Sequence, residues 1–273
     1  MRVAGAGSGR QGIMTDSPLL SPSHGQDAKA FSGIAHIGVD EAGRGCLAGP
    51  VVAAAVLFPP GFDCGAELPG LGDSKKLTEA KRDALAVLIR ERCAACGVGL
   101  SWQDEIDGVN IRNATFRAMT RAVFGLVAAL EEREAAPGGE LPLLVIDGNA
   151  VIPGAQWEFC AGAEPNGAGA WERLADVAPA RVPVRLPALP GQRAVVDGDA
   201  LVPAVSAASV LAKTARDSLL VRLDAIVPGY GFARHKGYGT REHLKAIRTM
   251  GPSEFHRKTF RGVRPEEEQL SLL

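Results

Sequence analysis

The chain has 273 residues, enough for one large hydrophobic core, and its 46% hydrophobic and 22% charged residues are typical of a folded globular protein. This balance excludes a collagen-like, mostly disordered or membrane-embedded chain. The formal net charge of -1 excludes binding of nucleic acid through an overall basic surface, so any such site must be local.

The cysteines indicate a reducing compartment rather than a fold stabilised by disulfide bonds. Their number is odd, five, and no signal-peptide pattern precedes them, so we expect a reducing, cytoplasmic location. Cys93 and Cys96 have the Cys-x-x-Cys spacing that can hold zinc or a redox disulfide, but no second pair completes a zinc site. We interpret them as cysteines on an ordinary helix face.

No apolar run reaches the roughly 18 residues that a membrane span needs.

The first third of the chain predicts a tail, two strands and a helix. Residues 1–30 are rich in small and polar residues and predict a flexible N-terminal tail. Residues 36–40 predict a strand, which a glycine-rich turn connects to a β-branched strand over 51–58. Residues 78–95 predict a helix with Thr78 as its N-cap.

The middle of the chain continues this alternation. Residues 98–102 predict a strand, residues 110–132 have the apolar spacing of a helix, and residues 143–146 predict a buried strand that ends at Asp147. Residues 153–182 are rich in Gly, Ala and Pro, and we interpret them as an extended surface insertion.

The last third predicts more helix than strand. Short strands are expected over 182–186 and 194–196, a long helix over 203–227, and a turn followed by a short helix over 237–250. Residues 265–273 are expected to form a C-terminal tail. Strands alternating with helices predict a mixed α/β domain, in which the first strands are antiparallel and the later ones are joined by helices.

Four acidic residues are placed where a metal site could form. Asp40 and Glu41 end the first predicted strand, Asp147 ends the central apolar run, and Asp199 follows residues 194–198. If these strands are neighbours, the carboxylates converge and repel one another unless a cation neutralises them. Oxygen ligands without nearby Cys or His suit Mg²⁺ or Mn²⁺, and such a two-ion site supports phosphodiester hydrolysis. Any one of these residues alone is equally compatible with an ordinary turn.

Six short motifs, in order along the chain, resemble those of the ribonuclease HII family. They are Gly-Val-Asp-Glu-Ala-Gly-Arg-Gly from 38 to 45, Asp-Ser-Lys-Lys-Leu from 73 to 77, Ile-Asp-Gly-Asn from 146 to 149, Gly-Asp at 198–199 with Ser-Ala-Ala-Ser at 206–209 and Lys213, the segment 229–240, and His-Arg-Lys-Thr-Phe from 256 to 260. The likeness covers about residues 34–264. The chain departs from the simplest family pattern in its tail before Gly33 and in the insertion between Asp147 and Asp199.

The resemblance implies a fold and a set of site residues. The fold is α/β, a ribonuclease H-like mixed central sheet flanked by helices with a small helical C-terminal region, forming one catalytic domain over 31–264. The implied catalytic and metal-binding residues are Asp40, Glu41, Asp147 and Asp199, with Mg²⁺ or Mn²⁺ in a two-metal site. The implied substrate-binding residues are Gly43, Arg44, Gly45, Ser74, Lys75, Asn149, Ser206, Lys213 and Tyr238.

Two of these elements are expected to read the ribose. In the family that this chain resembles, the turn Gly43–Gly45 and the tyrosine, here Tyr238, recognise the 2′-hydroxyl at an RNA-to-DNA junction. That hydroxyl is the group that separates RNA from DNA at a given position. A glycine backbone without Cβ can approach a sugar or phosphate closely, although a plain tight turn would use the same residues.

Basic side chains are candidates for contacts with backbone phosphates, which provide affinity rather than sequence preference. Residues 234–264 contain nine basic and two acidic residues, so the near-zero net charge hides a basic end. The candidates are Lys75, Lys76, Lys213, Arg216, Lys236, Arg257, Lys258, Arg261 and Arg264.

The resemblance thus implies an endonuclease that cuts the RNA strand of RNA/DNA hybrids and cuts 5′ of ribonucleotides embedded in duplex DNA, leaving 3′-hydroxyl and 5′-phosphate ends. One alternative is a hybrid-binding module that has lost its chemistry, which the presence of all four acids disfavours. Another is a different two-metal nuclease, such as a Holliday-junction resolvase, which would not select for a 2′-hydroxyl. The expected partners are the hybrid or the ribonucleotide-containing duplex, with a replication clamp left open, and we expect a monomer that does not bind membranes.

Overall fold

The computed structural model describes most of the expected domain. The described residues are 31, 34–72, 77–133, 141–162, 186 and 188–263. The tails expected over 1–30 and 265–273 therefore lie outside the described residues, as does the strand expected over 182–186 apart from Leu186, which is not in a strand.

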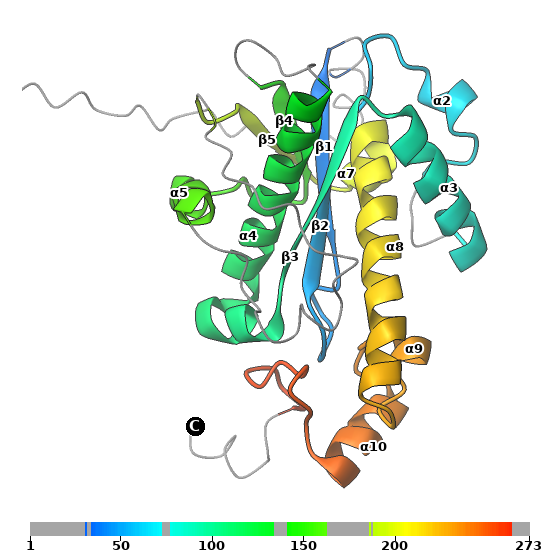
Figure 1. The fold of residues 1–273 in the computed structure, drawn as a ribbon, viewed down its shortest axis with the longest axis vertical. Coiled ribbons are helices and arrows are strands. Elements are labelled where there is room, and N and C mark those ends of the chain that lie inside the picture. The colour runs from blue at the N-terminus through cyan, green and yellow to red at the C-terminus, as the bar shows by residue number, and fades with distance from the viewer. Residues whose placement is uncertain are drawn as a thin grey trace, which may run out of the picture.

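A mixed five-stranded sheet forms the centre of the molecule (Figure 1). Its strands are β1 (His36–Ala42), β2 (Val51–Leu57), β3 (Ala95–Ser101), β4 (Leu143–Asp147) and β5 (Gln192–Val195). The spatial order is β3-β2-β1-β4-β5, with β1, β2 and β3 antiparallel and with β4 and β5 parallel to β1. Every residue of β2 is buried, as expected of a strand that is covered on both faces. The predicted fold class and the antiparallel start of the sheet are confirmed.

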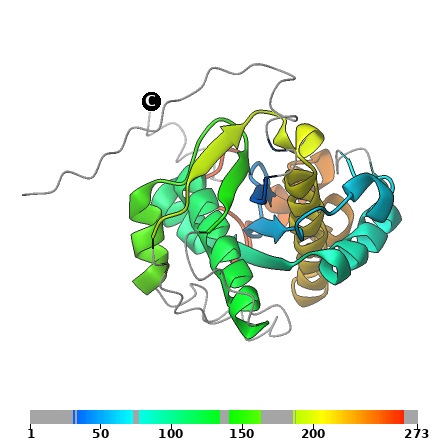
Figure 2. The same ribbon diagram turned by 90° about the horizontal axis from the view of Figure 1, so that it is seen from above.

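Long helices cover the two faces of the sheet (Figure 2). α4 (Gln103–Glu132) packs on one face, while α8 (Pro203–Ile226) and α3 (Glu79–Arg92) lie on the other. The long helices approach the sheet closely because glycines face them: a Cβ on Gly38 would lie 2.1 Å from the backbone of Ala204 in α8. This contact presses the start of α8 directly onto the central strand β1.

The shorter helices are peripheral to this sandwich. They are α2 (Cys64–Glu67), α5 (Gly154–Gly162), α7 (Gly198–Leu201), α9 (Phe232–His235) and α10 (Arg241–Met250). The surface insertion expected over 153–182 differs from the structure in its first part, because residues 154–162 form α5 rather than an extended loop. Trp157 of α5 is buried against Phe124 of α4, with ring centroids 5.9 Å apart. Residues 163–182 lie outside the described residues.

Element boundaries follow local signals, with two differences. Thr78 caps α3 as predicted, since its hydroxyl accepts a hydrogen bond from the Lys81 amide. The helix expected from residue 110 begins earlier, at Gln103, and is kinked at Asn110, whose φ is 69°. Cys93 and Cys96 do not share a helix face, because Cys93 ends α3 and Cys96 lies in β3. No helix within the described residues is long and apolar enough to span a membrane.

Candidate active site

Two of the predicted acids lie at the ends of neighbouring parallel strands. The register of β1 with β4 pairs Val39 with Ile146. One residue further along, Asp40 lies beside Asp147, which is the last residue of β4. The parallel pairing therefore brings together two carboxylates that are more than 100 residues apart in the sequence.

Both carboxylates lie on the face of the sheet that α8 covers. Side chains two residues apart along a strand point to the same face. Gly38 lies directly against the start of α8, and Val145 packs with Val205 of that helix. Asp40 and Asp147, two residues further along their strands, therefore point to the α8 face as well.

Asp199 approaches the same place from the next strand. β5 pairs with β4 so that Asp147 lies opposite Val195, and α7 begins three residues later at Gly198. A Cβ on Gly198 would lie 3.3 Å from Oδ1 of Asp147, so this glycine lets α7 pass beside the carboxylate. Asp199 follows in the first turn of α7 and is buried, with 6% of its surface exposed.

Asp40 lies close enough to Glu41 and Asp147 to be affected by their charges. Burial raises the pKa of Asp40 well above its usual value, and the negative charges of Glu41 and then Asp147 raise it further. A hydrogen bond from Ser209 of α8 and another from the Glu41 amide, 2.6 Å from Asp40 Oδ1, act in the opposite direction. Glu41 also lies 3.6 Å from Arg44. Burial and the neighbouring negative charges together disfavour the ionised form of Asp40, and a bound cation would relieve both effects.

The donor set fits a hard divalent cation. All four predicted ligands are carboxylates, which suit Mg²⁺ or Mn²⁺ better than softer metals. Among the described residues, no three His, Cys, Asp or Glu side chains are gathered tightly enough to form a ready-made ligand cluster. Mg²⁺ does not require one, because it is usually held by one or two carboxylates together with substrate phosphate and water. The convergent strand ends and the raised pKa of Asp40 therefore fit an ion whose coordination the substrate completes.

The turn that follows β1 is held by a buried arginine from the C-terminal end of the domain. The guanidinium of Arg257 donates hydrogen bonds to the carbonyl oxygens of Gly43 at 2.7 Å, Arg44 at 2.8 Å and Gly49 at 3.0 Å. Arg257 is completely buried, and burial followed by repulsion from Arg216 lowers its pKa to about 9. Its role is to position the turn.

Arg216 of α8 supports the same turn from below. It is also completely buried and donates to the carbonyl oxygens of Ala48 at 3.1 Å, Pro50 at 3.1 Å and Lys236 at 2.8 Å. A Cβ on Gly43, whose φ is +86°, would lie 1.7 Å from Nε of Arg216. Packing therefore explains why residue 43 is glycine.

Gly45 differs from Gly43 in this respect. No atom lies within 4 Å of the place where its Cβ would be, so packing within the described residues does not require a glycine there. Arg44, between the two glycines, has an exposed side chain. The open side of the turn is thus at residues 44 and 45, where a substrate backbone could approach.

Tyr238 lies on the same side of the molecule and is 45% exposed. The ammonium of Lys213 lies 5.5 Å from the centre of its ring and 2.9 Å from a carboxylate oxygen of Asp217. Burial of the hydroxyl end raises the pKa of Tyr238, and its side chain also interacts with Cys46. The tyrosine therefore has a defined position but a free face.

A chain of buried histidines holds the backbone of Tyr238. Nδ1 of His256 lies 2.9 Å from the Ser253 amide, which must donate to it, so the proton of His256 is on Nε2, 3.0 Å from Nε2 of His243. His243 in turn donates from Nδ1 to the carbonyl oxygen of Tyr238 at 2.9 Å. Each tautomer follows from the preceding hydrogen bond. Both rings are therefore neutral.

The remaining predicted substrate residues fall into three groups. Asn149 is exposed two residues after β4, close to the acids in sequence. Ser206 is buried and donates from its hydroxyl to the Gly72 carbonyl at 2.8 Å, which ties down the segment that leads to residue 73. Ser74 and Lys75 lie outside the described residues.

The sequence analysis missed Ser209, Arg257 and the histidines as supports of the site. Ser209 lies one helical turn from Ser206, and both are in the same motif, so no sequence signal separated the one that faces Asp40. The predicted phosphate contacts of Arg216 and Arg257 were wrong, because both side chains are completely buried on carbonyl oxygens. Their role could not be seen in a sequence where arginines are usually exposed.

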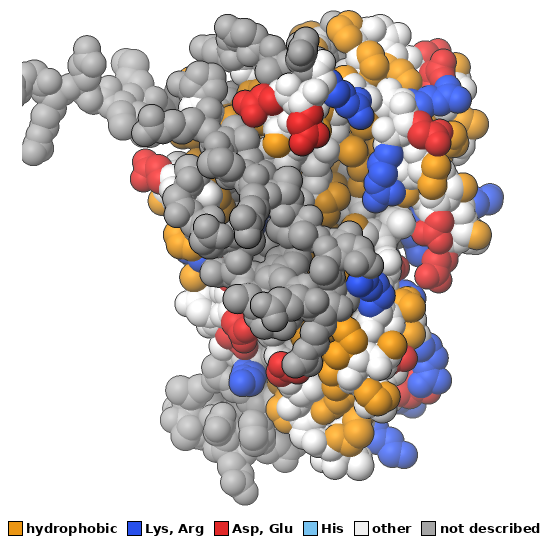
Figure 3. Space-filling view, in the orientation of Figure 1, with side chains coloured by type: hydrophobic (Ala, Val, Ile, Leu, Met, Phe, Trp, Pro, Cys, Tyr) orange, Lys and Arg blue, Asp and Glu red, His pale blue; other side chains and the backbone are white. Residues whose placement is uncertain are grey.

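The basic end of the chain is also partly neutralised. Arg234 lies 2.6 Å from Glu242, and Lys236 lies 3.4 Å from Glu79 of α3. On the face shown in Figure 3, Lys and Arg side chains alternate with Asp and Glu rather than forming one continuous patch. Among the predicted substrate and phosphate contacts, Arg44 and Lys258 have exposed side chains.

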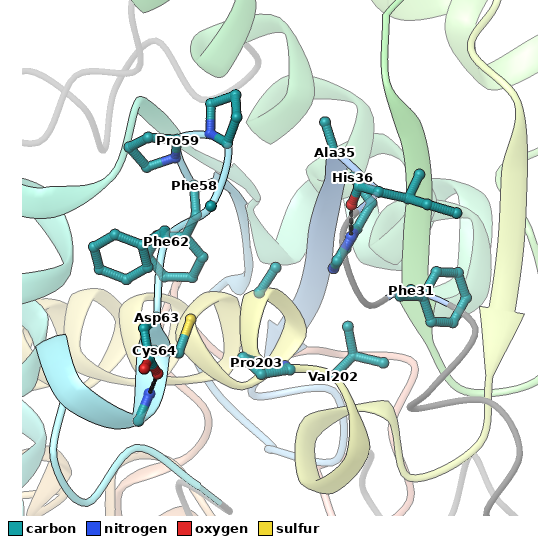
Figure 4. Close-up of a pocket in the computed structure, with 15 residues that line it drawn as sticks. Phe31, Ala35, His36, Phe58, Pro59, Phe62, Asp63, Cys64, Val202 and Pro203 are labelled. Atoms are coloured by element: carbon teal, nitrogen blue, oxygen red, sulfur yellow. Dashed lines mark hydrogen bonds between the residues drawn. The ribbon is translucent and has the colours of Figure 1, made fainter.

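A cavity of about 600 Å³ lies at the other end of β1 from the acids (Figure 4). Phe58 and Phe62 line one side, Phe31 and His36 the opposite side, and Val202 with its neighbours in the chain the floor. None of the four acids lines this cavity. It is therefore separate from the candidate active site.

Solved structures share this fold. Bst ribonuclease HIII in complex with Mn²⁺ matches with a TM-score of 0.59 at 18% identity, covering 90% of this chain and 72% of that one. A chain of the PCNA:RNase HII complex from Archaeoglobus fulgidus matches with a TM-score of 0.54 at 24% identity, covering 84% of this chain and 96% of that one. At these identities the likeness shows the fold, which is that of the ribonucleases H.

The family follows from closer likenesses. The family model described as ribonuclease HII matches residues 37–134 and 189–263. Ribonuclease HII of Nitratidesulfovibrio vulgaris is 48% identical over 238 residues, which cover 86% of this chain and 91% of that protein. The chain belongs to the ribonuclease HII family and is a ribonuclease H, an enzyme of the hydrolase class. The stretch between the two matched segments contains the insertion in which the sequence departs from the family pattern.

The buried histidines predict an acid-sensitive fold. Burial lowers the pKa of His243 and of His256 to about 4, against about 6.5 in an unfolded chain. Between these values the unfolded state binds protons that the folded state does not, so stability falls as pH decreases from about 6.5 to about 4. The expected loss is on the order of 1.4 kcal/mol per pH unit for each histidine.

Urea unfolding at a series of pH values between 7.5 and 4.5 measures this dependence. We expect the free energy of unfolding to fall less steeply with decreasing pH in His256→Asn than in the wild type. His36→Gln, a change outside this histidine chain, should keep the wild-type slope of unfolding free energy against pH. Asp40, whose raised pKa acts in the opposite sense, is common to all three proteins. Equal slopes in all three would contradict a role for the histidines.

Proposed function

We propose that the protein is an endonuclease that hydrolyses the RNA strand of RNA/DNA hybrids and cuts 5′ of single ribonucleotides in duplex DNA, leaving 3′-hydroxyl and 5′-phosphate ends. The observation that carries the proposal is the convergence of Asp40 and Asp147 on the α8 face, with Asp199 beside them and the turn Gly43–Gly45 directly after β1. This arrangement combines a cation site with a backbone surface that a sugar can approach.

The acids are proposed to hold two Mg²⁺ or Mn²⁺ ions. Metal dependence is typical of the family, and the solved ribonuclease HIII neighbour carries Mn²⁺. Bound ions supply an activated water and neutralise charge at the leaving oxygen. Asp40, Glu41, Asp147 and Asp199 are the proposed ligands, and Ser209 orients Asp40 through its hydrogen bond. No protein nucleophile is needed for hydrolysis of this kind.

The turn and the tyrosine are proposed to select the ribonucleotide. The open side of the turn at Gly45 allows a backbone amide to reach a 2′-hydroxyl, while the exposed ring of Tyr238 can stack on or contact the neighbouring sugar. Lys213, one helical turn after Ser209 in α8, lies beside the ring of Tyr238, where it can contact a phosphate next to the sugar.

A duplex DNA that contains one ribonucleotide tests the proposal. With Mg²⁺ or Mn²⁺ we expect a single cut 5′ of the ribonucleotide, and no cut in an all-DNA duplex of the same sequence. Mass analysis of the products reports the end chemistry. Equal cutting of the all-DNA duplex would favour a junction resolvase or another two-metal nuclease, and binding without cutting would favour a module that has lost its chemistry.

Replacing one acid tests the metal site by two readouts. We expect Asp40→Asn or Asp147→Asn to lower the cleavage rate by on the order of 10²-fold or more, because each removes a ligand. In EDTA, Asp40→Asn should melt at a higher temperature than the wild type, since a source of carboxylate repulsion is gone. Added Mg²⁺ should raise the melting temperature of the wild type more than that of the variant.

Asp197→Asn is the matched control for these variants. Asp197 is exposed, lies two residues before Asp199 and has a left-handed backbone conformation that asparagine also adopts. Its cleavage rate and its response to Mg²⁺ should equal those of the wild type. Full activity of Asp147→Asn would overturn the assignment of the acids.

The two glycines of the turn should separate folding from recognition. Gly45→Ala meets open space, so we expect wild-type stability together with a fall of at least ~10-fold in cutting at a single ribonucleotide, because the methyl group blocks approach of the sugar. Gly43→Ala is forced against Arg216 at positive φ, and should cost about 1–3 kcal/mol of folding stability. Urea unfolding and the single-ribonucleotide assay measure both. Unchanged cutting by Gly45→Ala would contradict the proposed contact.

We also propose that the protein binds a replication clamp. The Archaeoglobus fulgidus neighbour was solved with PCNA, and this chain carries the short apolar stretch Gln-Leu-Ser-Leu-Leu at 269–273 after three glutamates. Leucine side chains that become buried in a pocket of a partner contribute to affinity through the hydrophobic effect. Calorimetry with the clamp of the same organism should show binding that the double change Leu272→Ala and Leu273→Ala weakens at least ~10-fold, without a change in cutting of a short duplex. Equal binding by both proteins would contradict this segment's role.

A further inference from the structure

Two cysteines meet where α3 ends and β3 begins. Cys93 is the C-cap of α3, and Cys96 is the second residue of β3, where it pairs with Val56 of β2. The two side chains pack in the same hydrophobic cluster, and each thiol affects the pKa of the other. Both contribute to the hydrophobic cluster between the sheet, α3 and α8, with Cys93 4% exposed and Cys96 partly exposed. Cys96 is therefore the partly exposed member of the pair, and Cys93 is the buried one.

Two arginines flank this pair. The guanidinium of Arg133 is anchored on the carbonyl oxygens of Ala94 at 2.7 Å and Cys93 at 3.5 Å, directly over the turn. Arg90, in the last turn of α3, is the second neighbouring positive charge. A contact from Cys93 and these charges together lower the pKa of Cys96 to about 7, although burial opposes them.

The other cysteines have different surroundings. Cys64 is also partly exposed, but burial and the neighbouring Asp63 raise its pKa to about 11. Cys46 and Cys160 are buried, and burial raises the pKa of Cys160 to about 11. Cys64 is therefore an internal comparison for Cys96, because its thiol has similar access to solvent but not the same charge environment.

We propose that Cys93 and Cys96 form a redox-active pair that reacts with low-molecular-weight disulfides of the glutathione type. The Cys96 thiolate attacks one sulfur of the reagent, forms a mixed disulfide and releases one thiolate. Cys93 then loses its proton and attacks Sγ of Cys96, which forms the Cys93–Cys96 disulfide and releases the second thiolate. Two protein thiols are oxidised, one reagent disulfide is reduced to two thiols, and the two protons pass to the released thiolates.

This assignment follows the general requirements of thiol exchange. The attacking sulfur needs thiolate character near neutral pH and access to solvent, and a second cysteine must lie within reach to resolve the mixed disulfide. Cys96 meets the first two requirements and Cys93 the third. The pair stands apart from the acids and from Tyr238, so its chemistry does not depend on the proposed nuclease mechanism.

The test uses the native full chain and glutathione disulfide at pH 7.5. Aliquots are quenched with acid, alkylated and digested, and each cysteine peptide is quantified by mass spectrometry. We expect Cys96 to react at least ~10-fold faster than Cys64, and the end product to be a peptide that has lost two hydrogens and links Cys93 to Cys96. Dithiothreitol should restore both thiols.

Variants identify the role of each sulfur. Cys93→Ser should accumulate glutathione on Cys96 without further reaction, and Cys96→Ser should leave Cys93 unmodified. Arg133→Gln should slow the first step by raising the pKa of Cys96. Reaction of Cys64 as fast as Cys96, or a wild-type adduct on Cys96 that Cys93 never resolves, would overturn the proposal. Both of these outcomes are measured on the wild-type chain, so they do not depend on whether a variant folds.

Discussion

Hydrogen bonds from two buried guanidinium groups to main-chain carbonyls fix the turn that follows β1. Arg257 and Arg216 together contact six carbonyl oxygens, in the turn after β1, in the β1–β2 connection and at Lys236. A guanidinium presents its donors in a rigid plane, so each arginine fixes its carbonyls relative to one another. Truncating either side chain would leave several buried carbonyls unsatisfied, at about 1–3 kcal/mol each. The position of the turn is therefore tied to the stability of the C-terminal part of the domain.

α8 connects that side of the site to the acids. Ser209 contacts Asp40, Lys213 lies beside the ring of Tyr238, and Arg216 packs against Gly43 of the turn. These three residues are four and three positions apart in the sequence, so their side chains lie on one face of the helix. With a rise of about 1.5 Å per residue, the acid contact and the tyrosine contact are roughly 6 Å apart along the helix. Gly38 makes this possible, because it lets α8 lie flat against β1.

The sequence predicted the elements of the site better than their supports. Strand ends with acids, such as Asp40 and Asp147, could be found because apolar runs and their boundaries are local signals, and parallel pairing then brings these ends together. The burial of Arg257 could not, since its carbonyl partners lie more than 200 residues earlier in the chain. A basic residue next to other basic residues is indistinguishable in sequence from an exposed one. The sequence likewise did not show which of Ser206 and Ser209 contacts Asp40, because this depends on how α8 is rotated against the sheet.

The cysteine pair shows the same limit on a smaller scale. The spacing of Cys93 and Cys96 is compatible with a shared helix face, on which the two thiols would lie in an ordinary core. What changes their surroundings is the end of α3 at Arg92. The chain then enters β3, so that Cys93 is buried, Cys96 is partly exposed, and the guanidinium of Arg133 lies over the turn between them. If α3 ended one turn later, Cys93 and Cys96 would no longer meet at its end, and the guanidinium of Arg133 would no longer lie beside them. The proposed reactivity of this pair is therefore a property of the helix-to-strand junction, which no single residue of the motif reveals.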